Sequence, residues 1–366
     1  MSGLYRAGIA LIFCLPVCIF AQQGAAPTGD AAPPAQEPAL ANRPATPPDN
    51  AEGSMKLDVV VTDKSGKPIT GLDRADFTLL DNKQPAKILS FKTYNATAPT
   101  DEPRPEIILL FDTANVEERY VVTVRLEMMK FLRQNGGHLS QPVAILLMTN
   151  LGVTVEAQPS MDGNALAAIV EQFHPRLRTI GDNQGDWGDM ERFSFGTKWL
   201  GSIVQTETQI PGRKLLIWVG PGWPLLDGPG FYYSPQAQQA NFDEVVAFST
   251  RLREARMVLY SVAEGTSDIR STAYQDFMKG VKQAKQAFPP NLGLKVIAAQ
   301  SGGRILGPDN DLVGQINRAI ADATAFYTIS FDPPHADRPN EFHDLKVQIG
   351  KPGLTARTNT GYYNQP

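Results

Sequence analysis

Residues 107–111 form an apolar run that no polar residue interrupts, and the run stops at Asp112. A strand with one face in water alternates apolar and polar residues, whereas a strand covered on both faces is apolar throughout. The run therefore predicts the central strand of a parallel sheet that has helices on both faces. Because ligands of open α/β sheets bind at the carboxyl ends of the strands, Asp112 stands where a binding site is expected. The alternative is that Asp112 only caps the segment that follows it.

The rest of residues 104–323 alternates between short apolar runs and segments with helical spacing. The predicted strands are residues 143–148, 152–156, 214–219 and 257–262, and the predicted helices are residues 116–132, 166–173, 242–255 and 312–323. Strands that alternate with helices in this way form right-handed βαβ units. This segment is thus predicted to be a doubly wound, Rossmann-like α/β domain.

Two β-rich segments flank the predicted α/β domain. Residues 55–100 contain runs rich in valine, threonine, phenylalanine and leucine that are separated by turns, and residues 325–363 contain further alternating runs. The first segment has too few strands to build a core of its own. We therefore predict one immunoglobulin-like β-sandwich that is split between the two segments and has the α/β domain inserted into it. The alternative is two unrelated β extensions that each pack on the α/β domain.

The first 21 residues have the pattern of a secretory signal peptide, with one basic residue, one apolar stretch and a small residue, Ala21, before Gln22. Residues 22–54 are rich in proline and alanine and poor in large apolar residues, which predicts a disordered linker. We expect an exported protein, located in the periplasm, the cell envelope or the extracellular space. We expect no integral membrane span in the mature chain. A lipid anchor on Cys18 is the alternative.

Composition excludes several classes of function. The two cysteines, Cys14 and Cys18, lie in the predicted signal, so the mature chain would have no disulfide, cysteine nucleophile or thiolate metal ligand. A net charge of −4 without a basic stripe argues against a nucleic-acid partner. The four histidines lack the His-Glu-x-x-His spacing, and no Gly-x-Ser-x-Gly motif is present. We therefore predict no catalytic residues.

Six segments of the chain together carry a resemblance to a known family: the strand ending at Asp112 and residues 211–220, 255–262, 301–304, 325–331 and 361–363. In this order they resemble the secreted von Willebrand factor A-related proteins that are typical of acidobacteria. The resemblance covers roughly residues 55–363. It implies a von Willebrand factor A fold and a role in binding or adhesion.

The resemblance also implies where a metal would bind. In the metal-binding domains of this family, an Asp-x-Ser-x-Ser loop, a threonine from a second loop and an aspartate from a third hold Mg²⁺ or Mn²⁺ through oxygen atoms. Here only the first aspartate matches, as Asp112, because Ala114 and Val116 stand at the serine positions. Residues 220–222 read Gly-Pro-Gly where the third-loop aspartate is expected.

Two further residues are candidates to complete that site. Thr197, or Ser194 beside it, is the candidate for the second-loop hydroxyl, and Asn115 is a candidate substitute ligand. Too few hard oxygen ligands remain to hold the ion. We therefore expect a degenerate metal site and no cofactor, with Mg²⁺ or Mn²⁺ at Asp112 as the alternative.

Two loops near the predicted carboxyl edge carry further candidates. Aromatic residues bury much area with little loss of entropy, so they make good anchors for a protein or glycan, and four occur together: Trp223, Phe231, Tyr232 and Tyr233. The alternative is that they cover the sheet edge. A second group consists of Trp187 and four acidic residues, which predict an acidic loop that binds Ca²⁺ or is simply solvated: Asp182, Asp186, Asp189 and Glu191.

These observations favour an exported binding or adhesion module that recognises a protein or another cell-surface ligand. The recognising loops would be those near Asp112, Thr197 and Trp223. One alternative is an extracytoplasmic enzyme that uses the Asp112 edge, which would require an acid/base partner that the sequence does not reveal. Another alternative is a structural subunit of an envelope assembly.

Overall fold

The structure is a computed structural model that describes residues 54–100, 102–116, 118–173, 185–226, 233–262, 272–307 and 311–366. The predicted signal, residues 1–21, and all but the last residue of the predicted linker, residues 22–54, lie outside the described residues. Among the described residues, no helix has both the length and the apolar character that crossing a membrane requires.

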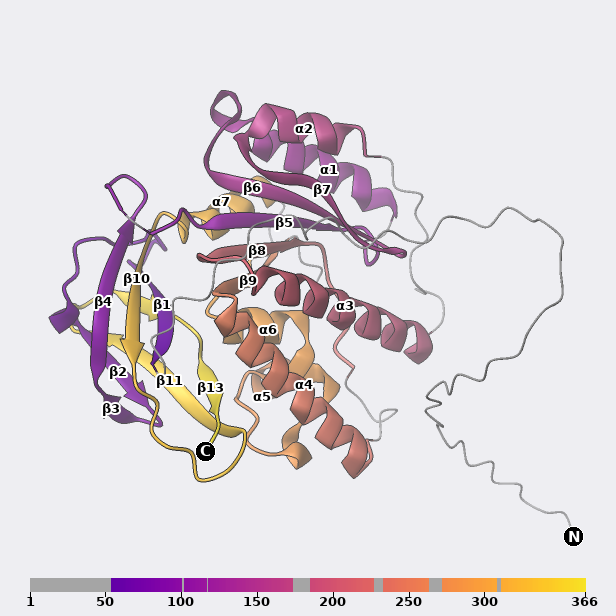
Figure 1. Cartoon of the computed structure of the whole chain (residues 1–366). Coiled ribbons are helices and arrows are strands. Elements are labelled where there is room, and N and C mark those ends of the chain that lie inside the picture. Colours follow the sequence, from indigo (N-terminus) through magenta and orange to yellow (C-terminus); the bar gives the residue numbers. More distant parts are fainter. Residues whose placement is uncertain are drawn as a thin grey trace, which may run out of the picture. The chain divides into compact units, whose positions relative to one another are not determined.

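A mainly parallel sheet of five strands lies at the centre of the fold (Figure 1). Its strands are β5 (Glu106–Asp112), β6 (His138–Thr149), β7 (Gly152–Asp162), β8 (Lys214–Val219) and β9 (Met257–Val262). Their order is β7-β6-β5-β8-β9, and only β7 is antiparallel to its neighbour. The predicted mixed α/β fold with a mainly parallel sheet is confirmed. The apolar strand ending at Asp112 is its middle strand.

Helices cover both faces of this sheet, as two separate hydrophobic clusters require. On one face lie α1 (Glu118–Leu132), α2 (Gly163–Glu171) and α7 (Leu312–Ala321). On the other face lie α3 (Asp186–Glu207), α4 (Pro235–Glu254) and α6 (Leu294–Gln300). The remaining helical elements are α5 (Thr272–Phe277) and the 3-10 turns η2 (Arg74–Asp76), η3 (Gln134–Gly137), η4 (Ala284–Gln286) and η5 (Pro289–Leu292).

Helix starts follow local capping rules. The Asp162 carboxylate accepts from the Ala165 amide at 3.0 Å and so begins α2 earlier than the apolar spacing predicted. Ser234 caps α4 in the same way, and Pro235 follows at the first helical position, where its missing amide costs nothing. The polar first turns of these helices explain why apolar periodicity alone placed both starts too late.

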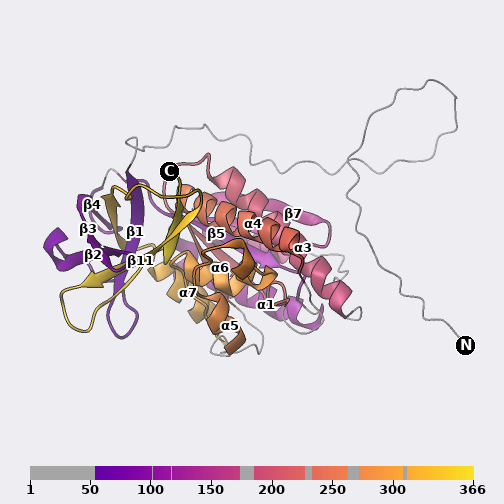
Figure 2. The same ribbon diagram turned by 90° about the horizontal axis from the view of Figure 1, so that it is seen from below.

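Strands from both ends of the described chain pair in two antiparallel sheets (Figures 1 and 2). One has the order β12-β1-β10-β4 and consists of β1 (Met55–Thr62), β4 (Ile88–Asn95), β10 (Ala325–Phe331) and β12 (Thr355–Arg357). The other has the order β13-β11-β2-β3 and consists of β2 (Phe77–Asp81), β3 (Gln84–Ala86), β11 (Glu341–Ile349) and β13 (Gly361–Asn364). Apolar residues from both sheets form one cluster, which includes Leu57, Leu79, Ile329, Val347 and Tyr362.

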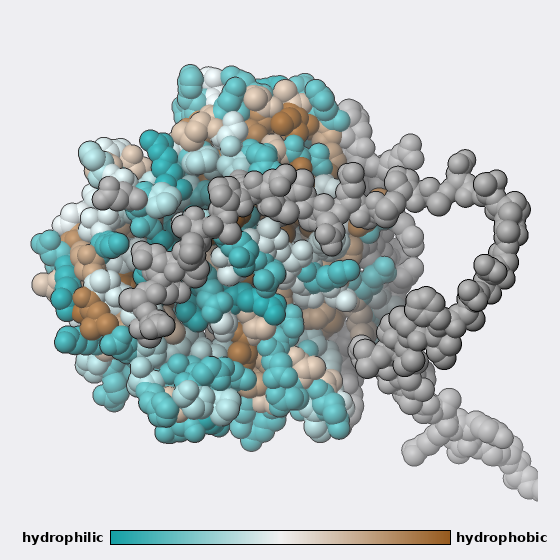
Figure 3. Space-filling view, in the orientation of Figure 1, coloured by the Kyte–Doolittle hydropathy of each residue, from teal (hydrophilic) through white to brown (hydrophobic). Residues whose placement is uncertain are grey.

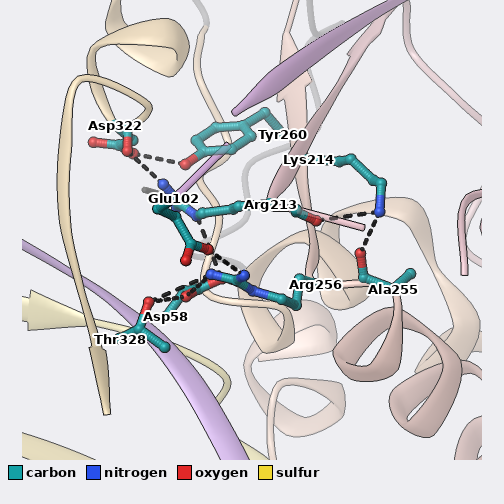
Figure 4. Close-up of polar contacts among 10 residues, drawn as sticks. Asp58, Glu102, Arg213, Lys214, Ala255, Arg256, Tyr260, Asp322 and Thr328 are labelled. Carbon is teal, nitrogen blue, oxygen red and sulfur yellow. Dashed lines mark hydrogen bonds and ion pairs between the residues drawn. The ribbon is translucent and has the colours of Figure 1, made fainter. Parts of the chain in front are cut away.

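A buried polar cluster links the antiparallel strands to the central sheet (Figure 4). Asp58 of β1 accepts from the Arg256 guanidinium at 2.8 and 3.0 Å and from the Thr328 hydroxyl at 2.8 Å. Arg256 immediately precedes β9 and also contacts Glu102. Burial acts to raise the pKa of Asp58, but the charge and hydrogen bonds of Arg256, together with Arg213 and Thr328, outweigh burial, so the pKa lies below its ordinary value. Asp58 is therefore held as a carboxylate between the two parts of the fold.

Two predictions of local structure were wrong. Residues 152–156 are only the first half of β7, which continues to Asp162 because it pairs with the long strand β6. Residues 186–191 do not form an acidic loop, because they begin the long helix α3, and Asp182 lies outside the described residues. Glycine, serine and threonine interrupt the apolar spacing of α3, so its sequence carries little helical periodicity.

Candidate functional site

The carboxyl ends of β5 and β8 meet at the point where the chain changes direction across the sheet. From β5 the chain first proceeds to β6 and β7 on one side, and then crosses to β8 and β9 on the other. Such a switch point is where open α/β sheets bind ligands. Asp112 is the last residue of β5 and lies at this point.

Hydrogen bonds within the protein occupy the Asp112 carboxylate. Its Oδ1 accepts from the amides of Ala114 and Asn115 at 3.1 and 3.0 Å and from Asn115 Nδ2 at 3.1 Å. Its Oδ2 accepts from Asn115 Nδ2 at 2.9 Å and from Trp218 Nε1 at 2.9 Å. A carboxylate has about four lone-pair positions, and these donors use them all. The side chain is fully buried, so it offers no open face to a metal ion or a substrate.

Burial raises the pKa of Asp112, and the bonds from Asn115 and Trp218 oppose that rise. Loss of hydration disfavours the charged form of a carboxyl, whereas donors that point at the carboxylate favour it. The indole of Trp218 and the turn formed by Ala114 and Asn115 therefore replace the water that Asp112 loses. The carboxyl has a structural role in the turn that follows β5. The amides that it accepts from precede α1, which begins at Glu118, so the structure does not show it capping that helix.

Other positions of the predicted metal site are also closed. A Cβ atom at Gly220 would lie 2.9 Å from the Asp112 Cβ, so the backbone approaches too closely for a third-loop carboxylate. Asn115 Oδ1 is buried and has no hydrogen-bond partner among the described residues, but a single amide oxygen does not make a metal site. No group of three or more histidine, cysteine, aspartate or glutamate side chains in the described chain is placed to hold a metal ion.

Thr197 does not lie on a loop as its predicted role required. It is half-buried in α3, and its hydroxyl donates back to the carbonyl of Phe193 at 2.9 Å and of Ser194 at 3.2 Å. A threonine hydroxyl inside a helix commonly bonds to the carbonyl one turn earlier. The Thr197 hydroxyl thus bonds within its own helix, and its role as a second-loop ligand stays a prediction.

The predicted aromatic anchors are divided. Trp223 is only 4% exposed, its ring packs edge-on against Trp218, and its Nε1 donates to the Leu292 carbonyl at 3.0 Å. It is a core residue and not the exposed anchor that was predicted. Tyr233 is half-buried with its ring 6.0 Å from that of Phe288. Phe231 and Tyr232 lie outside the described residues.

The first turn of α3 carries exposed apolar residues instead. Trp187 is 78% exposed and Met190 is 48% exposed. Asp186 and Glu191 flank them, and Asp189 pairs with Arg192. On the face in Figure 3, apolar residues lie in separate patches among hydrophilic ones. Exposed apolar side chains also occur on α1, but Trp187 is the largest exposed apolar side chain in the described part of the chain.

Helix α3 places this pair at the carboxyl edge of the sheet. The helix ends at Glu207 and β8 begins at Lys214, so the amino end of α3 lies toward the carboxyl end of β8. A helix of 22 residues is about 33 Å long, whereas a strand of 6 residues spans about 20 Å. The first turn of α3 consequently extends past the strand, as Figure 1 shows.

The turn between β6 and β7 packs on the same helix. A Cβ atom at Gly152 would lie 2.7 Å from Cζ2 of Trp199, and glycine avoids this clash because it has no Cβ atom. Leu151, the residue before it, is 85% exposed. The turn therefore presents a second apolar side chain next to α3.

No family model and no curated protein matches the sequence. Among solved structures, the human COPII-coat protein Sec24c is similar with a TM-score of 0.31 and 10% identity, over 72% of this chain and 44% of that chain. The VWA domain of SpRpn10 has a TM-score of 0.29 and 9% identity, over 60% of this chain and 97% of that chain. The pilus adhesin SpaC from Lactobacillus rhamnosus GG, in its open conformation, has a TM-score of 0.33 and 12% identity, over 81% of this chain and 42% of that chain.

This chain thus spans less than half the length of the Sec24c and SpaC chains. Similarities this weak identify neither a ligand nor an activity. The resemblance to the acidobacterial proteins stays a prediction that rests on the sequence.

Sequence reasoning missed Trp218 as the partner of Asp112. The two residues lie 106 positions apart, and no local pattern links them. Trp218 and Asp112 lie on the same face of the sheet. Alternation along β8 predicts this only if β5 and β8 are already known to be neighbours. Trp187 was noticed among the acidic residues, but its exposure depended on recognising α3.

Proposed function

We propose that this protein is an exported binding module of the von Willebrand factor A type that recognises a protein or another cell-surface ligand. The strand order β7-β6-β5-β8-β9 with helices on both faces supports this assignment, together with the resemblance of residues 55–363. The signal-like pattern of residues 1–21 supports export. Export is tested by asking whether the protein, expressed with its first 21 residues in a bacterial host, becomes accessible to protease outside the inner membrane.

The architecture that we propose is an α/β domain inserted into a split immunoglobulin-like β-sandwich. The antiparallel pairing of β1 with β10 and of β2 with β11 supports it, because each pair joins a strand that precedes the α/β segment to one that follows it. The shared apolar cluster of the two antiparallel sheets supports a sandwich. The β module would then hold both ends of the α/β domain.

We also propose that the metal site of this module is degenerate. The saturated carboxylate of Asp112 and the closed position at Gly220 support this. Titration of the metal-stripped protein with Mg²⁺ or Mn²⁺ in a calorimeter is then expected to give no saturable heat. Saturable binding that disappears in an Asp112→Ala variant, with the fold intact by circular dichroism, would contradict the proposal.

The exposed pair Trp187 and Met190 at the carboxyl edge is the observation that carries a binding function. An exposed tryptophan is costly to keep in water and is a residue type enriched at the centres of protein interfaces. Leu151 adds an exposed apolar side chain at the β6–β7 turn, which packs on α3 at Trp199, and Asp186 and Glu191 provide an acidic rim. We place the recognition surface on the first turn of α3 and the β6–β7 turn.

The test compares binding of the labelled protein to an envelope fraction of the producing organism. A variant with Trp187→Ala and Met190→Ala is expected to bind at least about tenfold more weakly, which corresponds to about 1.4 kcal/mol. Its melting temperature should stay unchanged, because both side chains are exposed.

Leu89→Ala serves as the matched control. Leu89 is an exposed apolar residue of β4, at 42% exposure, and lies outside the proposed surface. It should bind as the unaltered protein does. Equal affinity for the double variant and the unaltered protein would overturn the proposed surface.

A further inference from the structure

The strand β11 has an unpaired edge along its second half. On one side it pairs with β2 from Leu345 to Ile349, and on the other side β13 pairs only with Glu341 to Asp344. The short strand β12, which follows β11 in the chain, pairs with β1 of the other sheet. In the part of the chain that the structure describes, residues 345–349 therefore pair with another strand on one side only.

The hydrogen-bond pattern shows which backbone groups face the open side. Asp344 accepts from the Asn82 amide, and the Gly350 amide donates to Asp76, so the even-numbered residues of β11 bond to β2. In an antiparallel pair, the odd-numbered residues of β11 therefore point their amides and carbonyls away from β2. The Leu345 amide does so and donates to Thr360 at 2.9 Å. Val347 and Ile349 consequently present their backbone groups to the open side.

A groove runs along this open edge. Its volume is about 610 Å³, and its walls are residues 345–349 of β11 on one side and residues 354–360 with Gly302 and Gly303 on the other. Val347, Ile349, Leu354 and Ala356 belong to or pack on the apolar cluster shared by the two antiparallel sheets, so the floor of the groove is apolar. An extended chain lying there would meet backbone partners on one side and apolar surface beneath.

The charge of the groove favours an acidic occupant. Lys346 is exposed and lines the groove, and no aspartate or glutamate among the described residues does. Arg357 also lines it, with its guanidinium paired to Asp322 at 2.7 Å. A segment that alternates apolar and acidic residues would place its apolar side chains on the floor and its carboxylates near Lys346.

We propose that the groove beside β11 binds an extended acidic peptide segment of a partner protein, which adds to the sheet as a strand along Val347 and Ile349. Main-chain hydrogen bonds to a sheet edge supply affinity in this mode of recognition, and alternate side-chain positions supply specificity. The site is separate from the first turn of α3, and this inference does not rest on the proposed function.

The test uses a short synthetic peptide in which valine alternates with glutamate, added to the full chain. Hydrogen exchange of the Val347 and Ile349 amides, followed by NMR, should slow at least about tenfold when the peptide is present. The same peptide with proline at its central valine lacks a donor for the ladder and should give no protection. Lys346→Glu should weaken binding of the valine–glutamate peptide by about five- to tenfold.

Lys92→Glu is the matched control, because Lys92 is an exposed lysine on β4, the edge strand of the other antiparallel sheet. It should leave the affinity for the peptide unchanged. Loss of binding in Lys92→Glu with retention in Lys346→Glu would move the site to β4 and overturn the proposal. Protection of Val347 and Ile349 before any peptide is added would show that this chain already fills the groove, and would also overturn it. Retained peptide binding in Trp187→Ala separates this result from the test of the proposed function.

Discussion

At the scale of single residues, Asp112 illustrates how one side chain can occupy a functional position without the function. It stands at the carboxyl end of the central strand, where a ligand is expected, yet every lone pair of its carboxylate meets a donor of the same chain. The indole of Trp218 is the donor that comes from a different strand. The stability that the Trp218–Asp112 hydrogen bond contributes is therefore the most direct measure of the structural role of Asp112.

We expect Trp218→Phe to lower the free energy of unfolding by about 1.5–3 kcal/mol beyond the loss of ring area, because a buried carboxylate loses a donor. Trp223→Phe is the matched control, since the Trp223 indole donates to the neutral Leu292 carbonyl in the same apolar cluster. Loss of the hydrogen bond in Trp223→Phe should lower the free energy of unfolding by less, about 0.5–1.5 kcal/mol. Urea unfolding of both variants gives the comparison, and equal losses would contradict a charged acceptor at Asp112.

At the scale of elements, α3 decides what the carboxyl edge presents. Its buried face packs on the sheet through Leu200, Ile203 and Val204, while its first turn extends beyond β8 and exposes Trp187. Two glycines within the helix differ in their surroundings. A Cβ atom at Gly196 would lie 2.2 Å from Cε3 of Trp223, whereas one at Gly201 would lie 3.6 Å from Cζ of Phe248.

We expect Gly196 and Gly201, two of the three glycines of α3, to respond to alanine with opposite signs. Gly201→Ala should raise the free energy of unfolding by up to about 1 kcal/mol, because alanine favours the helix and its methyl group has room. Gly196→Ala should lower it by about 1–3 kcal/mol, because the methyl group displaces the Trp223 ring. Thermal unfolding measures both. Stabilisation by Gly196→Ala would mean that α3 does not pack on Trp223 in this way.

At the scale of the whole molecule, the polar cluster around Asp58 connects the antiparallel strands to the central sheet (Figure 4). Arg256 reaches Asp58 of β1 from the start of β9, and Arg213 lies 3.9 Å from the same carboxylate. Asp322 adds a second link, because it accepts from Tyr260 of β9 at 2.8 Å and from Arg357 of β12 at 2.7 Å. Breaking the first link should thus affect the stability of the whole fold.

We expect Arg256→Ala to lower the free energy of unfolding by about 3–5 kcal/mol, because Asp58 stays buried and loses the guanidinium that bonds both of its oxygens. Arg133→Ala is the matched control. It breaks an exposed pair with Glu171, whose side chains are 46% and 57% exposed, and should cost at most about 1 kcal/mol. Equal, small losses in urea unfolding would show that the Asp58 cluster does not couple the two parts.

The depressed pKa of Asp58 also predicts how stability depends on pH. Because the pKa is lower in the folded state, the carboxylate contributes stability above the unfolded pKa of about 3.9 and loses it as the pH falls through the folded value. We expect stability to decline on acidification below about pH 4. An Asp58→Asn variant should be less stable at neutral pH and show a shallower acid decline. Parallel curves for the two proteins would contradict the assignment.

The apolar runs by themselves determined the middle of the fold. Residues 107–111, 214–219 and 257–262 became buried strands because burial on both faces leaves no polar position in the chain, and this signal is local. The alternating runs of residues 325–331 and 343–349 likewise indicated strands, which the structure contains as β10 and β11. The spacing of apolar residues reflects which faces of a segment are buried, so it predicts strands and helices whose burial follows a regular pattern.

Only the tertiary structure decided which side chains meet. Strand order brought Trp218 to Asp112, and the packing of α3 turned Trp223 inward and left Trp187 outside. The groove beside β11 likewise exists because β13 is short and β12 joins the other sheet. Each of these outcomes depends on register and distance between segments that are remote in sequence, and local propensity carries no information about either.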